Sequence, residues 1–294
     1  MYKYVVYNYV LCSEYKCDFL KEADATRQYE NKTIQVDIEL LTLSKKEKNF
    51  TYQYLSNAFK GKWNDVEFDV NFEKFSIRIV APSVEIAFLI LLNIPLSLLL
   101  LSDNKIILHC SCTMDEFGIY AFSGNKGDGK STIAAIFAAH NRAIFSDDTL
   151  CIDIDGKTVY SNNTIEKYSQ NTVSMLEDLT DVGDLTINEY NHKFIKRLDA
   201  YQAVQNLRKL NLVFLFRGDC FHCKKITNNS IKKNLFMNNI VGYKYVNQET
   251  KIKINQIVEK LFSSHEISVK ILYIPQIDIN SIKSFKDNLE IILK

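Results

Sequence analysis

A glycine-rich octapeptide near the middle of the chain carries the residue types that bind phosphate. Gly124-Asn-Lys-Gly-Asp-Gly129-Lys130-Ser131 matches the pattern G-x-x-x-x-G-K-[ST]. Glycine permits backbone angles that turn N–H groups toward phosphate oxygens, and a helix N-terminus adds positive potential. Lys130 would reach the β- and γ-phosphates, and the Ser131 hydroxyl would ligate Mg²⁺. We therefore predict nucleotide contacts from Gly124, Asn125, Lys126, Gly127, Asp128, Gly129, Lys130, Ser131 and Thr132.

Two adjacent carboxylates, Asp147 and Asp148, follow Ser146 at the expected end of the next strand. Such a pair can divide two tasks: one carboxylate holds Mg²⁺, directly or through water, and the other accepts a proton from an attacking hydroxyl. The alternative is a pair of solvated turn residues. The position of the pair after the glycine-rich motif favours a role in catalysis, and the residues alone do not assign the two tasks.

Other candidates are a histidine before the motif and basic residues after it. His109 lies on a strand that we expect beside the strand of the motif, although a lone histidine there is also typical of an ordinary core or surface position. Arg217 is the first candidate to neutralise charge on a transferring phosphoryl group, with Lys193 and Arg197 behind it. For each of these three residues the alternative is a solvated surface charge.

The elements around the motif predict a mixed α/β order. Residues 117–122 form an apolar strand before the loop, and the alanine-rich residues 131–140 form a buried helix after it. Residues 142–145 then form a strand that ends at Ser146. Residues 150–160 alternate around Asp155-Gly156, a dipeptide typical of a tight hairpin.

The remaining chain divides into a β-rich segment, residues 1–80, and a P-loop domain, residues 81–294, whose core is a mixed sheet with helices. Residues 161–201 show no clear pattern. Outside the motif the apolar spacing predicts strands at residues 4–12, 33–41, 66–70, 75–80, 105–110, 212–216 and 269–274, and helices at residues 254–262 and 282–292.

The apolar stretch from residue 84 to residue 101 has about the minimum length of a membrane span. It contains Glu85, Asn93, Pro95 and Ser97, and it lacks basic residues at its N-terminal end. We therefore predict a pair of buried helices and no membrane span. Pro95 would end or kink the first helix, and the second would run on to Ser102.

Composition narrows the class of protein. The chain has 294 residues, of which 47% are hydrophobic, so it can bury a sizeable core. Its 36 basic and 35 acidic side chains balance, which argues against nucleic acid as a partner.

The seven cysteines, an odd number, favour a reducing cytoplasm. Cys220 and Cys223 have C-x-x-C spacing, but no second pair follows to complete a zinc site.

The order of the motifs resembles the HPr kinase/phosphorylase family. In that family a histidine precedes the phosphate-binding loop and an Asp-Asp pair follows its helix, as His109, residues 124–131 and Asp147-Asp148 do here. The chain is more similar still to the HPr-kinase-like proteins of ribosomal peptide biosynthesis, including lasso-peptide precursor kinases. Their β-rich N-terminal segment is like residues 4–14. The resemblance covers most of the chain and is specific from about residue 108 to residue 154.

The resemblance implies transfer of phosphate from ATP, with Mg²⁺, to a serine hydroxyl. By position, Asp147 would be the base that receives the serine proton, Asp148 a Mg²⁺ partner, and His109 a neighbour that assists the base or the phosphate. Thr132 stands where HPr-specific enzymes carry glutamate, and their C-terminal signature is not found, so the implied acceptor is a peptide or protein other than HPr. Because the HPr enzymes are oligomers, the resemblance also allows a homo-oligomer.

Three hypotheses follow. The first is an ATP- and Mg²⁺-dependent kinase of a serine on a peptide or protein, such as a ribosomally made precursor. The second is a kinase of a small molecule, such as an amino acid or a sugar, which a closed pocket would favour. The third is a nucleotide-binding regulatory protein without catalysis, in which removal of the Asp147 carboxylate changes nothing measurable. ATP, GTP and pyrophosphate all remain open as the donor.

Overall fold

The fold is mixed α/β, as the sequence predicts. Four sheets combine parallel and antiparallel pairs, and seven α-helices lie among the described residues. The computed structural model describes residues 1–30, 32–41, 47–139, 143–153, 158–161, 165–177, 186–188, 193–197, 204–207, 209–264, 266–275 and 282–293.

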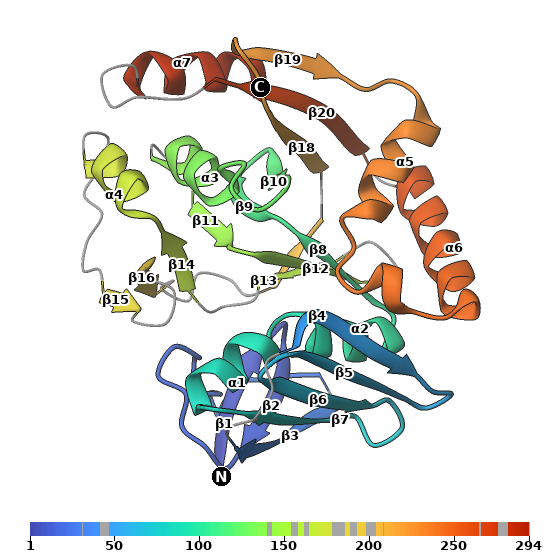
Figure 1. Ribbon diagram of the computed structural model, residues 1–294. Coiled ribbons are helices and arrows are strands. Elements are labelled where there is room, and N and C mark those ends of the chain that lie inside the picture. Colours follow the sequence, from blue (N-terminus) through green and yellow to red (C-terminus); the bar gives the residue numbers. More distant parts are fainter. Residues whose placement is uncertain are drawn as a thin grey trace.

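The first seven strands form one sheet in the N-terminal part of the chain, at the bottom of Figure 1. Its order is β1-β2-β3-β7-β6-β5-β4, in which β2, β3 and β7 pair in parallel. The strands are β1 (Tyr2–Val6), β2 (Tyr9–Ser13), β3 (Thr33–Leu40), β4 (Glu47–Tyr54), β5 (Ala58–Asn64), β6 (Val66–Asn71) and β7 (Ser76–Ala81).

The prediction of one strand over residues 4–12 is wrong. Tyr7 and Asn8 both have positive φ, 51° and 69°, and they reverse the chain between β1 and β2. Two-residue turns of this kind usually carry Asn-Gly or Asp-Gly, so a tyrosine in the first position hides the turn from sequence analysis. The bounds of β3, β6 and β7 lie within one residue of the prediction, whereas β4 and β5 were not predicted.

The apolar stretch forms the predicted pair of buried helices, α1 (Val84–Leu91) and α2 (Ile94–Ser102). Pro95 does not kink α1; it lies in the first turn of α2, where its missing N–H costs nothing. Helix α2 packs between β6 and β8 (Lys105–His109). In the described part of the chain no single helix is long and apolar enough to cross a membrane, and this pair reaches that length only together, bent by 41°.

Two sheets carry the elements of the predicted site. A six-stranded sheet has the order β11-β9-β10-β18-β20-β19, and a four-stranded antiparallel sheet has the order β17-β13-β12-β8. A third, small sheet has the order β14-β16-β15. The strands are β9 (Ser111–Asp115), β10 (Gly118–Ser123), β11 (Ala143–Ser146), β12 (Thr149–Asp153), β13 (Thr158–Ser161), β14 (Ile165–Tyr168), β15 (Thr186–Asn188), β16 (Lys193–Arg197), β17 (Val204–Asn206), β18 (Lys209–Arg217), β19 (His222–Lys225) and β20 (Glu266–Ile274).

Helices cover both faces of the six-stranded sheet (Figure 1). Alternate residues of β10, β18 and β20 pack against α3 (Lys130–Ala138) and α7 (Ile282–Leu293) on one face, with α4 (Gln170–Glu177) beside α3. The other face packs against α5 (Asn229–Asn238) and α6 (Gln248–Ser264), which the short helix η1 (Tyr243–Tyr245) joins. The core on this second face continues through α1 and α2 into the N-terminal sheet, so the expected parts 1–80 and 81–294 share a core.

The strand of His109 does not lie beside the strand of the motif, so that prediction is wrong. Strand β8 belongs to the four-stranded sheet, and the unpredicted β9 pairs with β10 instead. The chain passes from one sheet to the other at Cys110. The predicted hairpin after Asp148 is confirmed by the antiparallel pair β12–β13, while Asp155 and Gly156 lie outside the described residues.

Gly61 gives a prediction about stability. It pairs with Phe68 across β5 and β6, and a Cβ atom at this position would lie 2.3 Å from Phe68 Cζ. The Phe68 ring is buried and stacks on Phe59, so it has little room to move. We expect Gly61→Ala to lower the free energy of unfolding by about 1–3 kcal/mol in chemical denaturation. The exposed neighbour Lys60→Ala should change it by less than about 0.5 kcal/mol, and equal effects would contradict this view.

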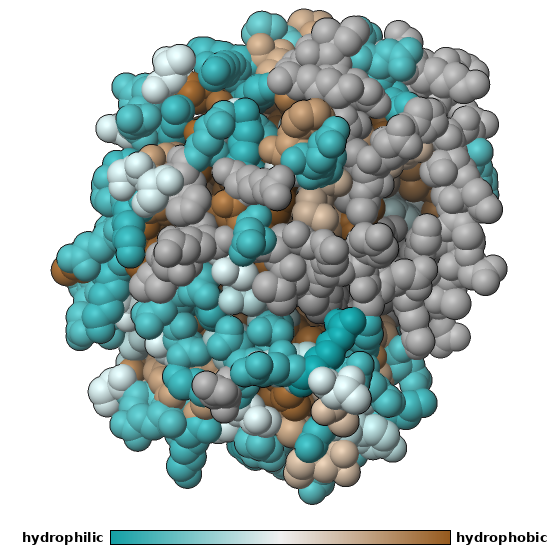
Figure 2. All heavy atoms as spheres, turned by 180° about the vertical axis from the view of Figure 1, so that it is seen from behind, coloured by the Kyte–Doolittle hydropathy of each residue, from teal (hydrophilic) through white to brown (hydrophobic). Residues whose placement is uncertain are grey.

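The surface on the far side of the molecule is mostly hydrophilic. In Figure 2 the described residues on this face are largely polar, and hydrophobic ones are scattered between them. Scattered apolar residues of this kind are normal on a folded domain.

Candidate functional site

The glycine-rich loop, residues 124–129, joins β10 to α3, which is the position that the motif predicts. Gly127 and Gly129 have φ of 93° and 90°, in the left-handed region that strains any residue with a side chain. Within the loop the Asn125 N–H donates to Asp128 Oδ2 at 2.6 Å. The first N–H groups of α3 have no acceptor within the helix, so the loop and helix together offer donors and positive potential to an anion.

Lys130 is buried and folds back over the glycine-rich loop. Its Nζ donates to the carbonyl oxygens of Gly124 and Asn125, both at 3.0 Å, and among the described residues these are its hydrogen-bond partners. Burial lowers the pKa of Lys130, while the charges of Asp148 and Asp128 raise it. Burial destabilises an ammonium group whose partners are neutral carbonyls, so an anion that binds beside it would stabilise its charge.

Asp147 connects the helix after the loop to the turn between β11 and β12. Its side chain is almost fully buried, and Oδ1 accepts hydrogen bonds from Ser131 Oγ at 2.9 Å and from Ser111 Oγ at 2.6 Å. The two hydroxyl oxygens lie 3.3 Å apart. Carboxylate and hydroxyl oxygens are the ligands that Mg²⁺ prefers. Ser131 and Asp147 therefore fit a Mg²⁺ ion whose other ligands are phosphate oxygens and water.

Asp148 and His109 lie on the other side of the same turn. Asp148 has a φ of 69°, and its carbonyl oxygen accepts from the Cys110 N–H at 3.1 Å and lies 3.0 Å from His109 Nδ1. Burial is the main cause that lowers the pKa of His109, followed by the charge of Lys130, while Asp148 and Asp147 raise it. The structure thus brings together His109, Lys130 and the carboxylate pair, although β8 and β10 belong to different sheets.

Arg217 contacts the loop, and Thr132 lies in the first turn of the helix that follows it. Arg217 Nη2 donates to the Gly127 carbonyl at 3.1 Å from the end of β18. Thr132 Oγ1 lies 2.8 Å from Thr172 Oγ1 on α4. The other basic candidates, Lys193 and Arg197, belong to β16, whose side chains lie outside the described part of the structure.

Several residues that support the site were not predicted. The Ser123 hydroxyl lies 2.9 Å from the His109 carbonyl oxygen and also contacts Asn239 Oδ1, and the Asn239 carbonyl accepts from the His109 N–H at 2.9 Å. Ser111 was missed although it is a small polar residue two positions after His109. Asn239 offers no signal in the sequence because its contacts join segments more than 100 residues apart.

Among the described residues, Cys220 and Cys223 belong to no group of side chains that could hold a metal ion. Both are free thiols, Cys220 exposed and Cys223 half-buried. Across the residues that the structure describes, no group of three or more histidine, cysteine or acidic side chains is placed to hold a metal ion. A Mg²⁺ ion held by Ser131 and Asp147 would need no such group, because phosphate oxygens and water would complete its coordination shell.

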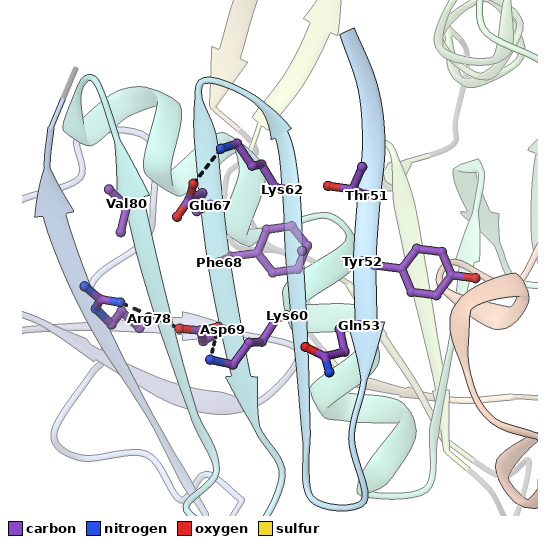
Figure 3. A pocket seen from close by; sticks show the side chains of 11 residues that line it. Thr51, Tyr52, Gln53, Lys60, Lys62, Glu67, Phe68, Asp69, Arg78 and Val80 are labelled. Carbon is purple, nitrogen blue, oxygen red and sulfur yellow. Dashed lines mark ion pairs between the residues drawn. The ribbon is translucent and has the colours of Figure 1, made fainter. Parts of the chain in front are cut away.

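A concavity of about 420 Å³ lies on the outer face of β4 to β7, away from these residues (Figure 3). Its charged side chains pair across the strands: Lys62 with Glu67 at 2.8 Å, Lys60 with Asp69 at 3.8 Å, and Arg78 with Asp69 at 3.6 Å. Arg78 also pairs with Glu39 beside the concavity, so three basic side chains meet three carboxylates and little net charge remains to attract a charged ligand. The concavity is therefore not the candidate site.

No protein-family model matches the chain, and no curated protein sequence matches it.

The half-buried His109 predicts a dependence of stability on pH. Because the native pKa of His109 is lower than its ordinary value of about 6.5, the unfolded chain binds the proton first as the pH falls. Stability should therefore be lost as the pH falls below about 6.5 and be unaffected above it. We expect the melting temperature of His109→Gln to fall less between pH 7.5 and pH 5.5 than that of the wild type. The exposed His222→Gln is the control, and equal falls in all three proteins would refute this role of His109.

Proposed function

We propose that this protein is an ATP- and Mg²⁺-dependent kinase that transfers the γ-phosphoryl group to a serine hydroxyl of a peptide or protein, such as a ribosomally made precursor of the lasso-peptide type. The observation that carries the proposal is the contact between Ser131 and Asp147. It links a phosphate-loop motif directly to the carboxylate pair, as transfer from a bound triphosphate requires. The family resemblance supplies the serine acceptor, and the cytoplasm is the compartment that we propose with it.

The residues of the site divide the work of phosphoryl transfer. The loop amides and Lys130 hold the phosphates, and Arg217, already in contact with Gly127, lies at the loop to neutralise charge on the transferring group. In the reaction the bond from the γ-phosphorus to the bridging oxygen of ADP breaks, and a bond to the serine oxygen forms. The serine proton passes to one of the two carboxylates.

Two assignments of the carboxylates are open to test. The resemblance makes Asp147 the base and Asp148 the Mg²⁺ partner. The contact of Asp147 favours the reverse, because its Oδ1 accepts a hydrogen bond from Ser131, the expected metal ligand, which would leave the base role to Asp148. His109 contacts the backbone carbonyl oxygen of Asp148 and does not distinguish the two assignments. Ser131 and one of the two carboxylates would hold Mg²⁺, which would help to neutralise the charge of the phosphates.

The test is transfer of label from γ-labelled ATP to serine-containing peptides encoded near this protein's gene. Each peptide is compared with a version in which the serine is replaced by alanine, and the phosphorylated residue is located by mass spectrometry. Phosphoserine that depends on Lys130 and Asp147 supports the proposal. Transfer to an amino acid or sugar, or ATP binding without any transfer, would favour the small-molecule kinase or the regulatory protein instead.

A further inference from the structure

The turn of the first hairpin, Tyr7-Asn8, is unusual in two ways. A bulky residue with positive φ is a conformational outlier, and turns normally lie at the surface. Tyr7 nevertheless has a φ of 51° and an exposed fraction of only 1%. Strained backbone of this kind persists only where surrounding contacts hold it, and it concentrates at functional sites.

The contact that holds Tyr7 leads to the carboxylate pair. Its hydroxyl makes a buried hydrogen bond with Thr149 Oγ1, although 142 positions separate the two residues. Thr149 is the first residue of β12 and directly follows Asp148, which is itself in the left-handed region. The Ser146 hydroxyl closes the same turn by donating to the Thr149 carbonyl at 2.5 Å.

Glu30, in the segment that follows this hairpin, is linked to the opposite end of β12. The Glu30 N–H donates to the Asn8 carbonyl at 2.9 Å, and the Glu30 carboxylate lies 3.3 Å from Lys105 Nζ. Lys105 in turn pairs at 2.7 Å with Asp153, the last residue of β12. The N-terminal part of the chain therefore contacts β12 directly at its first residue, and through Lys105 of β8 at its last.

We propose that the β1–β2 turn supports the candidate catalytic site, and that Tyr7 is a positioning residue whose hydroxyl holds Thr149 and thereby sets the Asp147-Asp148 turn. The expected effect on catalysis rests on the proposed function, whereas the expected effect on the geometry of the turn rests on the contacts alone. Burial raises the pKa of Tyr7, so its hydroxyl keeps its proton throughout the working range. The segment does more than cover an edge of the catalytic sheet.

The test compares two tyrosines of one hairpin. Tyr7→Phe removes the bond to Thr149, and Tyr9→Phe removes a partly buried bond, from Tyr9 Oη to Asp103 Oδ2 at 2.5 Å, that leads away from the site. We expect Tyr7→Phe to lower kcat about tenfold, the rate equivalent of one buried hydrogen bond, with KM for ATP within about twofold. Tyr9→Phe should lower the melting temperature to a similar extent but leave kcat unchanged. Thr149→Val should match Tyr7→Phe, and the double variant should lose no more than either single one.

A second readout does not depend on activity. Hydrogen exchange at the Cys110 amide, which donates to the Asp148 carbonyl, should be faster in Tyr7→Phe than in Tyr9→Phe. If the wild type transfers no phosphate, the kinase proposal fails while the exchange result still decides the positioning role. Equal exchange and equal kcat in the two variants would overturn the inference.

Discussion

Replacing Lys130 by methionine should lower kcat/KM for ATP-dependent transfer by about 10³-fold or more and weaken ATP binding, because the variant keeps the apolar stem but removes the buried charge. The Nζ atom now contacts the Gly124 and Asn125 carbonyls, from which it can turn to the β- and γ-phosphates. Isothermal titration calorimetry with ATP and the peptide assay measure the two effects.

The stability of the same variant separates a binding role from a structural one. Burial of the Lys130 ammonium costs free energy in the protein without ligand, as its lowered pKa indicates. Lys130→Met should therefore unfold at the same temperature as the wild type or higher, while its nucleotide binding is lost. Lys74→Ala, an exposed lysine in the turn between β6 and β7, is the matched control that should bind ATP normally. Unchanged ATP affinity in Lys130→Met would remove the loop as a phosphate site.

The sequence predicted the structure best where the residues of a motif and the elements beside it are neighbours in the chain. The glycine-rich loop requires a strand before it and a helix after it, and β10 and α3 lie where this requirement puts them. The apolar stretch likewise could be interpreted as buried helices because Pro95 and polar residues interrupt it. In both cases the signal lies within about twenty neighbouring residues.

Contacts between distant segments were not predictable in the same way. The apolar pattern of β8 and β10 did not show that they join different sheets, because a strand buried on both faces does not encode its neighbours. Strand β4 was missed although its second half, from Phe50 to Tyr54, alternates aromatic and polar residues as a strand does. The contact of Tyr7 with Thr149 depends on a turn formed by a tyrosine, a residue that turn preferences do not favour.

Replacing Asp147 by asparagine should lower kcat by about 10³-fold, with KM for ATP changed only a few-fold, because it removes a buried charge beside the reacting phosphate. Asparagine keeps one acceptor oxygen for the Ser111 and Ser131 hydroxyls, which now donate at 2.6 and 2.9 Å, so the turn should still fold. Circular dichroism and thermal unfolding check the fold, and the peptide assay measures the rate. Asp115→Asn, at the opposite end of β9 from Ser111, serves as the control.

The dependence of the rate on Mg²⁺ then assigns the two carboxylates. If Asp147 holds the metal, as its contact with Ser131 favours, Asp147→Asn should raise the Mg²⁺ concentration for half-maximal rate. Asp148→Asn should then leave that concentration unchanged and lower kcat by removing the base. The opposite pattern would support the assignment from the family resemblance, with Asp147 as the base. Full activity in both variants would contradict phosphoryl transfer at this site, because no other carboxylate contacts the Ser131 hydroxyl among the described residues.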